Sequence, residues 1–293
     1  MASRKFNLFH LSLIQLRQMD LESFEGTREE WIRHSLKESF SFSYRAGMTM
    51  HWVKLEDDIF DDCIYGLLEL KRSHERHEPP ERGGAEIITE EWQGAYVIID
   101  PTHHSDGQKV AVENDIVGKP SAILGGLIDA INARIDKCYT IEYEPIFDSR
   151  SFWKFAKDND NILKSITFDF VVPNMWDASG GLDKDLKETG DDTGADRVKV
   201  KLSAKQGVSA KGKKVKAGVD YAERGAGTID AVAEDGTPYS SKTKPKTTKV
   251  PKVDGDRTTL RDYFRTAKDR ILGREKTSIE RGADGSGGDT GSV

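Results

Sequence analysis

The clearest alternation of hydrophobic and polar positions in this chain lies between residues 119 and 174. From Pro120 to Ile135, isoleucine and leucine recur at three- and four-residue steps, which predicts a buried amphipathic helix. Cys138–Ile146 and Ile162–Val172 have the composition and period of strands. A short aromatic helix around Trp153 is expected between them. Helix, strand, helix and strand in this order indicate an α/β or α+β domain.

Further strands are expected before this stretch, where short alternating, aromatic or β-branched segments recur. These segments are Lys5–Leu16, Phe40–Tyr44, Met48–Leu55, Cys63–Lys71, Gly94–Asp100 and Lys109–Val112. Thr27, followed by two glutamates, has the features of a helix cap. Arg72–Gly84 is charged and almost free of apolar residues, so a solvated loop is expected there. We predict a main α+β domain over residues 1–175, with a mixed sheet and the 120–135 helix at its centre.

The chain changes character after Asn174, where apolar residues become sparse and Asp, Lys and Gly become frequent. Residues 176–255 are predicted to form a smaller, basic, lysine-rich α+β lobe. It should contain a strand with one lysine-bearing face at residues 198–202. Asp235-Gly236 between two short strand-like segments predicts a hairpin.

The C-terminal part is expected to begin with an amphipathic helix over residues 256–273, capped near Thr258. Its narrow apolar stripe favours docking onto the body of the protein over binding to a partner. Residues 274–293 are rich in Gly, Ser and Asp. They are predicted to be disordered, because they cannot bury enough apolar surface to offset the entropy lost on ordering.

Composition and charge add a candidate partner. The 293 residues are 36% hydrophobic and 32% charged, which suits one large or two medium domains with a part outside the core. The net charge of −6 hides an uneven distribution. Between Arg197 and Lys252, fourteen Lys or Arg stand against five Asp or Glu, so this segment carries +9 and the rest of the chain −15. A basic segment on an acidic body points to a polyanion.

Three groups of lysines in this segment are dense enough to neutralise several phosphates and displace counterions. They are Lys199 and Lys201, then Lys211, Lys213, Lys214 and Lys216, then Lys242, Lys244, Lys246 and Lys249. Lysine outnumbers arginine and aromatic residues are few, so contact with the DNA or RNA backbone is expected without reading of the bases. The alternative is a solvated surface, or one that complements the acidic part of the same chain.

A metal-dependent nuclease is the alternative enzymatic hypothesis. Asp58, with Asp57, Asp61 or Asp62 beside it, precedes a predicted strand that carries Glu69 and Lys71 on one face. Such enzymes use carboxylates to hold Mg²⁺ and a lysine near the attacked phosphate. The charged outer face of an ordinary strand has the same residues, and that interpretation is the more frequent one.

Other chemistry has less support. The histidines at 74, 77, 103 and 104 lack a zinc-binding spacing, and no phosphate-binding loop or hydrolase elbow is present. No cofactor is expected apart from Mg²⁺ in the nuclease hypothesis. Cys63 and Cys138 have no pairing pattern, and neither a secretory leader nor an apolar run of membrane-spanning length is found. A cytoplasmic protein without a membrane partner is therefore expected.

Several short segments resemble uncharacterised bacterial proteins encoded on mobile elements and in phage-defence islands. The segments are Ser121–Asn174, with Tyr143-Glu144-Pro145-Ile146, Phe152-Trp153 and Val172-Pro173-Asn174, followed by Gly225-Ala226-Gly227 and Asp235-Gly236-Thr237-Pro238-Tyr239-Ser240. The resemblance covers about the middle half of the chain and contributes no catalytic residues. It implies a bacterial intracellular setting and a role in antiviral defence.

These observations predict a cytoplasmic binding protein that contacts nucleic acid through its lysines. One alternative is a metal-dependent nuclease, or another phosphoryl-acting enzyme, built on Asp58, Glu69 and Lys71. Another is a subunit of a larger complex that binds a protein partner through the Thr258–Leu272 helix.

Overall fold

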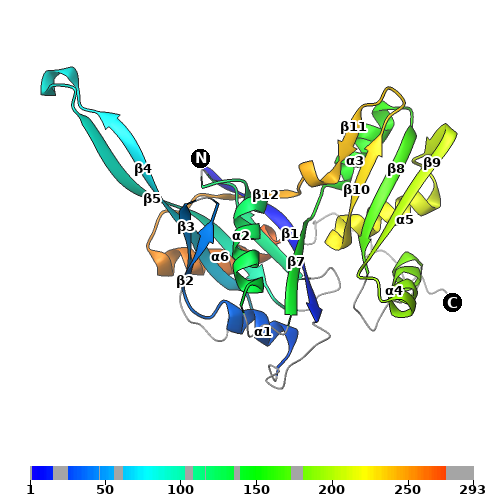
Figure 1. Cartoon of the computed structure of the whole chain (residues 1–293), viewed down its shortest axis with the longest axis horizontal. Coiled ribbons are helices and arrows are strands. Elements are labelled where there is room, and N and C mark those ends of the chain that lie inside the picture. Colours follow the sequence, from blue (N-terminus) through cyan, green and yellow to red (C-terminus); the bar gives the residue numbers. More distant parts are fainter. Residues whose placement is uncertain are drawn as a thin grey trace, which may run out of the picture.

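The computed structural model describes residues 2–15, 26–45, 47–55, 62–102, 108–115, 117–134, 139–172 and 181–274. In these ranges it contains two sheets, of eight and four strands, and six α-helices (Figure 1). The chain is therefore an α+β protein, as expected. The prediction of a mixed sheet is wrong, because all strand pairings among the described residues are antiparallel. From β2 to β6 the strands are joined in chain order by short connections, which favour this orientation, since a parallel pair needs a long crossover.

The larger sheet has the strand order β12-β1-β6-β5-β4-β3-β2, and β7 also pairs with β1. Its strands are β1 (Ser3–Gln15), β2 (Phe40–Tyr44), β3 (Met48–Lys54), β4 (Ile64–His77), β5 (Glu86–Asp100), β6 (Gln108–Glu113), β7 (Tyr139–Pro145) and β12 (Thr247–Pro251). One edge of β1 pairs with β6, and the other edge pairs first with β12 and then with β7. Three strands are thus attached to β1.

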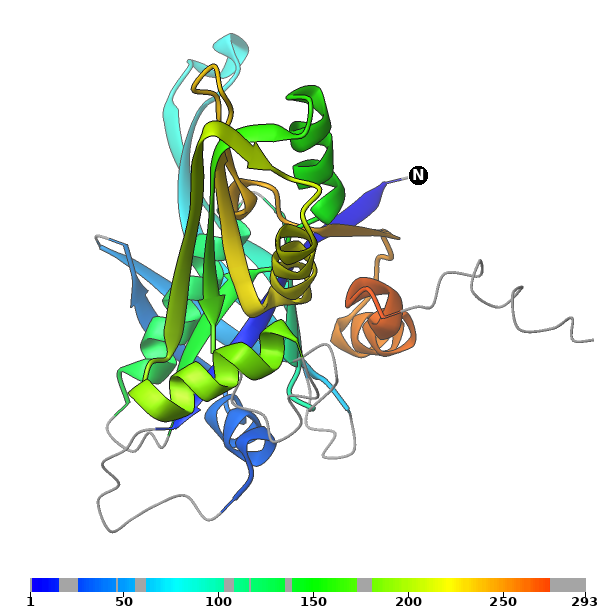
Figure 2. The ribbon, with the colours of Figure 1, turned by 90° about the vertical axis from the view of Figure 1, so that its right-hand side faces the viewer.

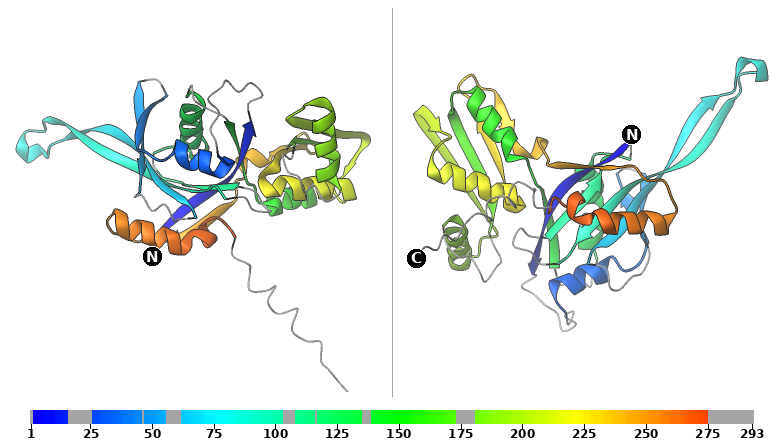
Figure 3. Two further views of the ribbon diagram at one scale, coloured as in Figure 1. Left: turned by 90° about the horizontal axis from the view of Figure 1, so that it is seen from below. Right: turned by 180° about the vertical axis from the view of Figure 1, so that it is seen from behind.

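Helices cover both faces of the larger sheet (Figure 3). Helices α1 (Arg28–Ser35) and α2 (Pro120–Asn132) lie on one face, and α6 (Arg257–Ile271) lies on the other. Alternate residues of β1 pack on opposite faces of the sheet. Phe9 and Leu11 lie in the core that includes α1 and α2. Phe6 and Leu8 lie in the core that includes α6. Both faces of β1 are therefore buried.

Local signals in the sequence explain where these helices begin. The Thr27 hydroxyl accepts a hydrogen bond from Glu30 N (3.2 Å), and the Glu30 carboxylate accepts one from Thr27 N (2.7 Å), which completes the expected capping box at α1. Pro120 occupies the first turn of α2, where a proline lacks no needed hydrogen bond. Helix α6 begins at Arg257, and Asp256 rather than Thr258 caps it by accepting from Thr259 N (2.8 Å).

The apolar stripe of α6 is buried against the larger sheet. Leu260, Phe264, Ile271 and Leu272 are at most 7% exposed. Beyond the end of the helix, Arg274 forms an ion pair with the buried carboxylate of Asp100 at the end of β5. Docking onto the body, which the stripe favoured, is thus what occurs, and the apolar face of the Thr258–Leu272 helix is not available to a protein partner.

The smaller sheet has the order β11-β10-β8-β9. Its strands are β8 (Ile162–Val171), β9 (Arg197–Ser209), β10 (Gly227–Val232) and β11 (Pro238–Ser240), and the helices that accompany it are α3 (Ser149–Asp158), α4 (Leu182–Thr193) and α5 (Lys213–Tyr221). Helices α3 and α5 lie on one side of the sheet (Figure 2). Phe152, Phe168 and Val219 form part of a core of its own for this lobe.

This lobe is inserted between two strands of the larger sheet. The chain leaves after β7 and returns at β12, and the two crossing segments are antiparallel neighbours: Phe147 bridges to Pro245, and Lys246 N donates to Ile146 O (2.6 Å). The arrangement differs from the linear division that we expected near residue 175. Helix α3 and strand β8 pack in the core of the inserted lobe, whereas β12 and α6 belong with the larger sheet.

An extended hairpin replaces the loop expected at Arg72–Gly84. Strand β4 continues to His77 and pairs without interruption with β5 as far as Glu86, around a short 3₁₀ turn at Pro80–Arg82. The outer part of this hairpin, residues 71–93, is named the arm here, and it projects well beyond the body of the protein (Figure 1). The sequence gives no sign of the arm, because a two-stranded ribbon buries no apolar face and so has no hydrophobic period.

Replacing Phe264 with Ala should strongly destabilise the protein. Phe264 is fully buried and its ring contacts those of Phe6 and Tyr96, with centroid distances of 6.0 and 4.9 Å. We expect Phe264→Ala to lower the free energy of unfolding by about 3 to 5 kcal/mol, since a large cavity replaces the ring. Denaturant unfolding measures this. The neighbouring Arg265→Ala is the control and should change stability by less than about 1 kcal/mol; equal losses in both variants would contradict the docking of α6.

Candidate functional site

The lysines predicted to bind nucleic acid lie on several elements. Lys199 and Lys201 are exposed on β9, on the face opposite to Val198 and Val200, which pack in the core of the lobe. Strand β9 is an edge strand that pairs only with β8 among the described residues. The expected lysine-bearing strand face is therefore confirmed. Helices α3 and α5 leave this face of the sheet uncovered (Figure 2).

The second group of lysines surrounds the start of α5. Lys211, Lys213, Lys214 and Lys216 are all exposed. Gly212 occupies the cap position and offers no side chain to the first amide groups of the helix. An uncapped helix start presents N–H groups and a partial positive charge, to which the lysines add. The side chain of Lys214 is 91% exposed and reaches an acid, Asp185, only at 4.0 Å.

The third group is separated from the other two. Lys242, Lys244 and Lys246 lie on the segment that returns from the inserted lobe, and Lys249 lies on β12 in the larger sheet, paired with Lys5 of β1. These four residues lie on elements other than β9 and α5. The ten predicted residues therefore do not make one surface.

The inserted lobe as a folded unit is also less basic than its C-terminal sequence. Residues 147–246 contain eighteen Lys or Arg and sixteen Asp or Glu. Many of the acids precede β9, and α4 alone exposes Asp185, Glu188, Asp191 and Asp192. Positive charge is thus concentrated at β9 and the start of α5 rather than spread over the lobe.

The proposed nuclease residues are only partly placed. Asp58 lies outside the described residues. Glu69 and Lys71 lie two residues apart on one face of β4, as expected, but Lys71 Nζ forms a 2.6 Å ion pair with Glu90 of the arm. Within the described ranges, no group of three or more His, Cys, Asp and Glu side chains is arranged to hold a metal ion.

Glu69 has neighbours that the sequence did not indicate. The register places Ser41, His51 and Glu69 directly across from one another on β2, β3 and β4. Ser41 Oγ lies 2.7 Å from His51 Nδ1, and the His51 ring packs edge-on against Trp92 (5.2 Å between centroids). A hydroxyl, an imidazole and a carboxylate thus follow one another across the sheet. Only the cross-strand register, which sequence patterns do not specify, brings them together.

The histidines of the sequence analysis belong to different places. His74 is part of the arm, where its Nε2 lies 3.4 Å from Gln93 Nε2 and 3.7 Å from Glu91 Oε2. His77 is exposed near the tip of the arm. His103 and His104 lie outside the described residues.

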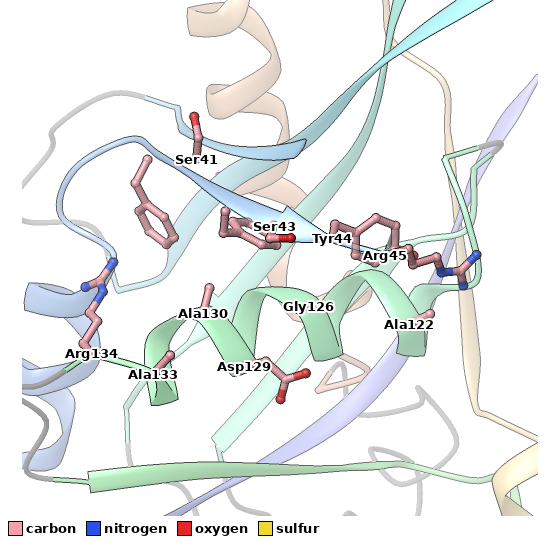
Figure 4. Close-up of a pocket in the computed structure, with 12 residues that line it drawn as sticks. Ser41, Ser43, Tyr44, Arg45, Ala122, Gly126, Asp129, Ala130, Ala133 and Arg134 are labelled. Atoms are coloured by element: carbon pink, nitrogen blue, oxygen red, sulfur yellow. The ribbon is translucent and has the colours of Figure 1, made fainter. Parts of the chain in front are cut away.

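A groove separates the edge strand β2 from α2 (Figure 4). It has a volume of about 750 Å³ and is lined by the aromatic side chains of β2 and by a stripe of small residues on α2. The stripe comprises Ala122, Gly126 and Ala130, and a side chain at Gly126 would collide with Tyr44, since its Cβ would lie 2.8 Å from Tyr44 Cδ2. Glycine therefore permits the close approach of helix and strand.

An arginine lies over an aromatic ring at each end of this groove. The Arg134 guanidinium is 4.6 Å from the centre of the Phe40 ring, and that of Arg45 is 5.2 Å from the Tyr44 ring. Tyr44 is 5% exposed, and its buried hydroxyl has no hydrogen-bond partner among the residues that the structure describes. The groove was not predicted, although the aromatic alternation of β2 and the four-residue spacing of small side chains on α2 are visible in the sequence.

Comparisons with protein-family models, with curated proteins and with solved structures found no match to this chain. The resemblance to proteins of mobile elements and phage-defence islands therefore stays a hypothesis. Among the described helices, none is both long and apolar enough to cross a bilayer.

Cys63 is a poor nucleophile at neutral pH. It is 4% exposed, and burial raises the pKa of its thiol to about 11, more than nearby Lys268 lowers it. The reactive species is the thiolate, which would make up only about one part in a thousand at pH 8.

The thiol of Cys63 should accordingly react slowly. In a Cys138→Ser variant, which leaves Cys63 as the only cysteine, iodoacetamide labelling of the folded protein at pH 8 should be at least about 100-fold slower than in denaturant. The rate should rise as the pH approaches 11, because the raised pKa keeps the thiol protonated below that value. Mass spectrometry measures the rates; equal rates for folded and unfolded protein would contradict the burial of this side chain.

Proposed function

We propose that this protein binds nucleic acid through two groups of lysines, one on β9 and one at the start of α5, together called the strip. The strip comprises Lys199, Lys201, Lys211, Lys213, Lys214 and Lys216. The observation that carries the proposal is the exposed start of α5, where four lysines surround helix amide groups that no side chain caps. Phosphate oxygens suit such a site, because amide N–H groups, the helix dipole and ammonium groups all favour an anion.

The expected mode of binding is contact with the phosphate backbone. Lysine ammonium groups are point charges that displace counterions without reading base edges. The lysines on the return segment and on β12 lie apart from the strip, so we assign them no part in it. A bacterial intracellular setting and a role in phage defence are proposed only on the resemblance of the middle of the chain.

Removing the lysines at the start of α5 should weaken binding and reduce its salt dependence. For duplex DNA, the variant Lys211→Ala/Lys213→Ala/Lys214→Ala should lower the slope of log K against log salt by about 2 to 3, since each lost phosphate contact contributes roughly 0.9. Fluorescence anisotropy with mixed-sequence DNA and RNA at several salt concentrations measures the slope.

A matched control removes the same charge elsewhere on the lobe. Lys154→Ala/Lys157→Ala/Lys184→Ala changes exposed lysines of α3 and α4 and should leave the slope close to that of the unaltered protein. Equal losses in the two triple variants would show a general charge effect, and the absence of salt-dependent binding in the unaltered protein would refute the proposal.

A second candidate is a phosphoryl-acting enzyme that uses Glu69 and Lys71. The observation in its favour is the row of Ser41, His51 and Glu69, which supplies a hydroxyl and a proton acceptor beside a carboxylate. A bound Mg²⁺ would supply charge stabilisation to the transferred phosphoryl group.

If this candidate is correct, nucleic-acid cleavage should require Mg²⁺ and Glu69→Ala should lower its rate by about 100-fold or more. Glu75→Ala is the matched control, since Glu75 is an exposed glutamate farther along the same strand. Gel analysis of labelled DNA and RNA, with and without EDTA, measures cleavage. Activity that persists in Glu69→Ala would remove this residue from the chemistry.

A further inference from the structure

The arm exposes apolar side chains on a strand with a free edge. Ile87, Ile88 and Trp92 are 43, 68 and 53% exposed. Strand β6 pairs with β5 only from Val97 to Asp100, so the outer edge of β5 in the arm pairs with no strand among the described residues. A ribbon with exposed apolar groups and unpaired backbone is a surface suited to adding to another sheet.

The groove beside β2 offers the complementary surface. Strand β2 pairs only with β3 within the described ranges, so its other edge is unpaired next to the groove. The side chain of Ser41 points away from α2 (Figure 4), which leaves the main chain of β2 to line that side. The arginines at the two ends favour an occupant with negative charge at both of its ends. Asp129 of α2 also lines the groove and disfavours a carboxylate elsewhere along it.

We propose that the arm of a second copy of this chain occupies the groove, with its β5 strand added to the free edge of β2. The spacing of the arginine sites along β2 matches the spacing of two glutamates along the arm. On β2, Phe40 under Arg134 and Tyr44 under Arg45 are four residues apart. On the arm, Glu86 and Glu90 are also four residues apart, which is about 13 Å along either strand.

The same register places an apolar side chain in the middle of the groove. Glu86, Ile88 and Glu90 share one face of β5, because alternate residues of a strand point the same way. With the two glutamates at the two arginines, Ile88 lies over Phe42 and the small residues of α2. The most exposed of the large apolar side chains on the arm is thereby buried.

The interactions that this docking replaces are weak. Glu90 pairs with Lys71 in the single chain, but both side chains are about half exposed, at 57 and 46%. Such pairs contribute little to stability. Each copy has one arm and one groove. In a two-fold symmetric dimer, each arm can therefore occupy the groove of the other copy, and no arm or groove is left for a third copy. A separate partner protein that supplies an acidic strand is the competing occupant.

Paired charge reversals test the exchange. Light scattering coupled to gel filtration should show that the full-length protein is a dimer, and that both Arg45→Glu/Arg134→Glu and Glu86→Arg/Glu90→Arg weaken dimerisation by about 10-fold or more. An equimolar mixture of the two variants should recover the dimer, because each arm then meets a groove of opposite charge. Ile88→Asp should also dissociate the dimer, and Arg82→Glu at the arm tip is the control that should not.

A loss of dimerisation must be distinguished from a loss of folding in these variants. Arg134 also donates to Ser35 O (2.8 Å), so thermal unfolding of each variant must show that it remains folded. Ile88 and the two glutamates are exposed on the arm and can change without disturbing the body. A monomer at every concentration measured would overturn the proposal, including the case in which the monomer binds an acidic peptide. So would a dimer that survives both charge reversals and Ile88→Asp.

Discussion

The structure depends on the occupancy of both edges and both faces of β1. The main chain of Leu8 on this strand meets the two segments that connect the sheets: Leu8 N donates to Lys246 O (3.1 Å), and Leu8 O accepts from Ile146 N (2.9 Å). The inserted lobe therefore leaves and rejoins the larger sheet at one point. Arg197 adds a second link, since it pairs with Glu144 of β7 and Asp169 of β8, each at 3.0 Å.

The opposite end of the larger sheet has unsatisfied edges instead. There β2 ends the sheet beside a groove, and the arm extends β4 and β5 beyond the support of their neighbours. An exposed sheet edge and a projecting ribbon promote strand addition, and natural proteins usually cover such edges. The arginines of the groove and the glutamates of the arm are opposite in charge, which is a physical reason for the arm of a second copy to cover the edge of β2.

Charge is organised by the fold rather than by the chain order. The segment from Arg197 to Lys252 is strongly basic as a sequence, yet α3, α4 and β8 bring the acids of an earlier segment into the same lobe. What remains positive are the exposed lysines on β9 and those at the start of α5. A count along the chain therefore finds the residues that can meet a polyanion but overstates the surface that they form.

The sequence by itself determined the local elements with a strong hydrophobic period or a cap, such as α2, the alternating strands β1 and β9, and the capping box at Thr27. Their conformations follow from short-range burial patterns and from hydrogen bonds between residues near in sequence. Only the tertiary structure decided the strand register that aligns Ser41, His51 and Glu69, the insertion of the lobe, the pairing of the arm and the groove beside β2. These depend on contacts between residues far apart in the chain, and no local pattern of side chains specifies which of several possible partners a strand or helix will meet.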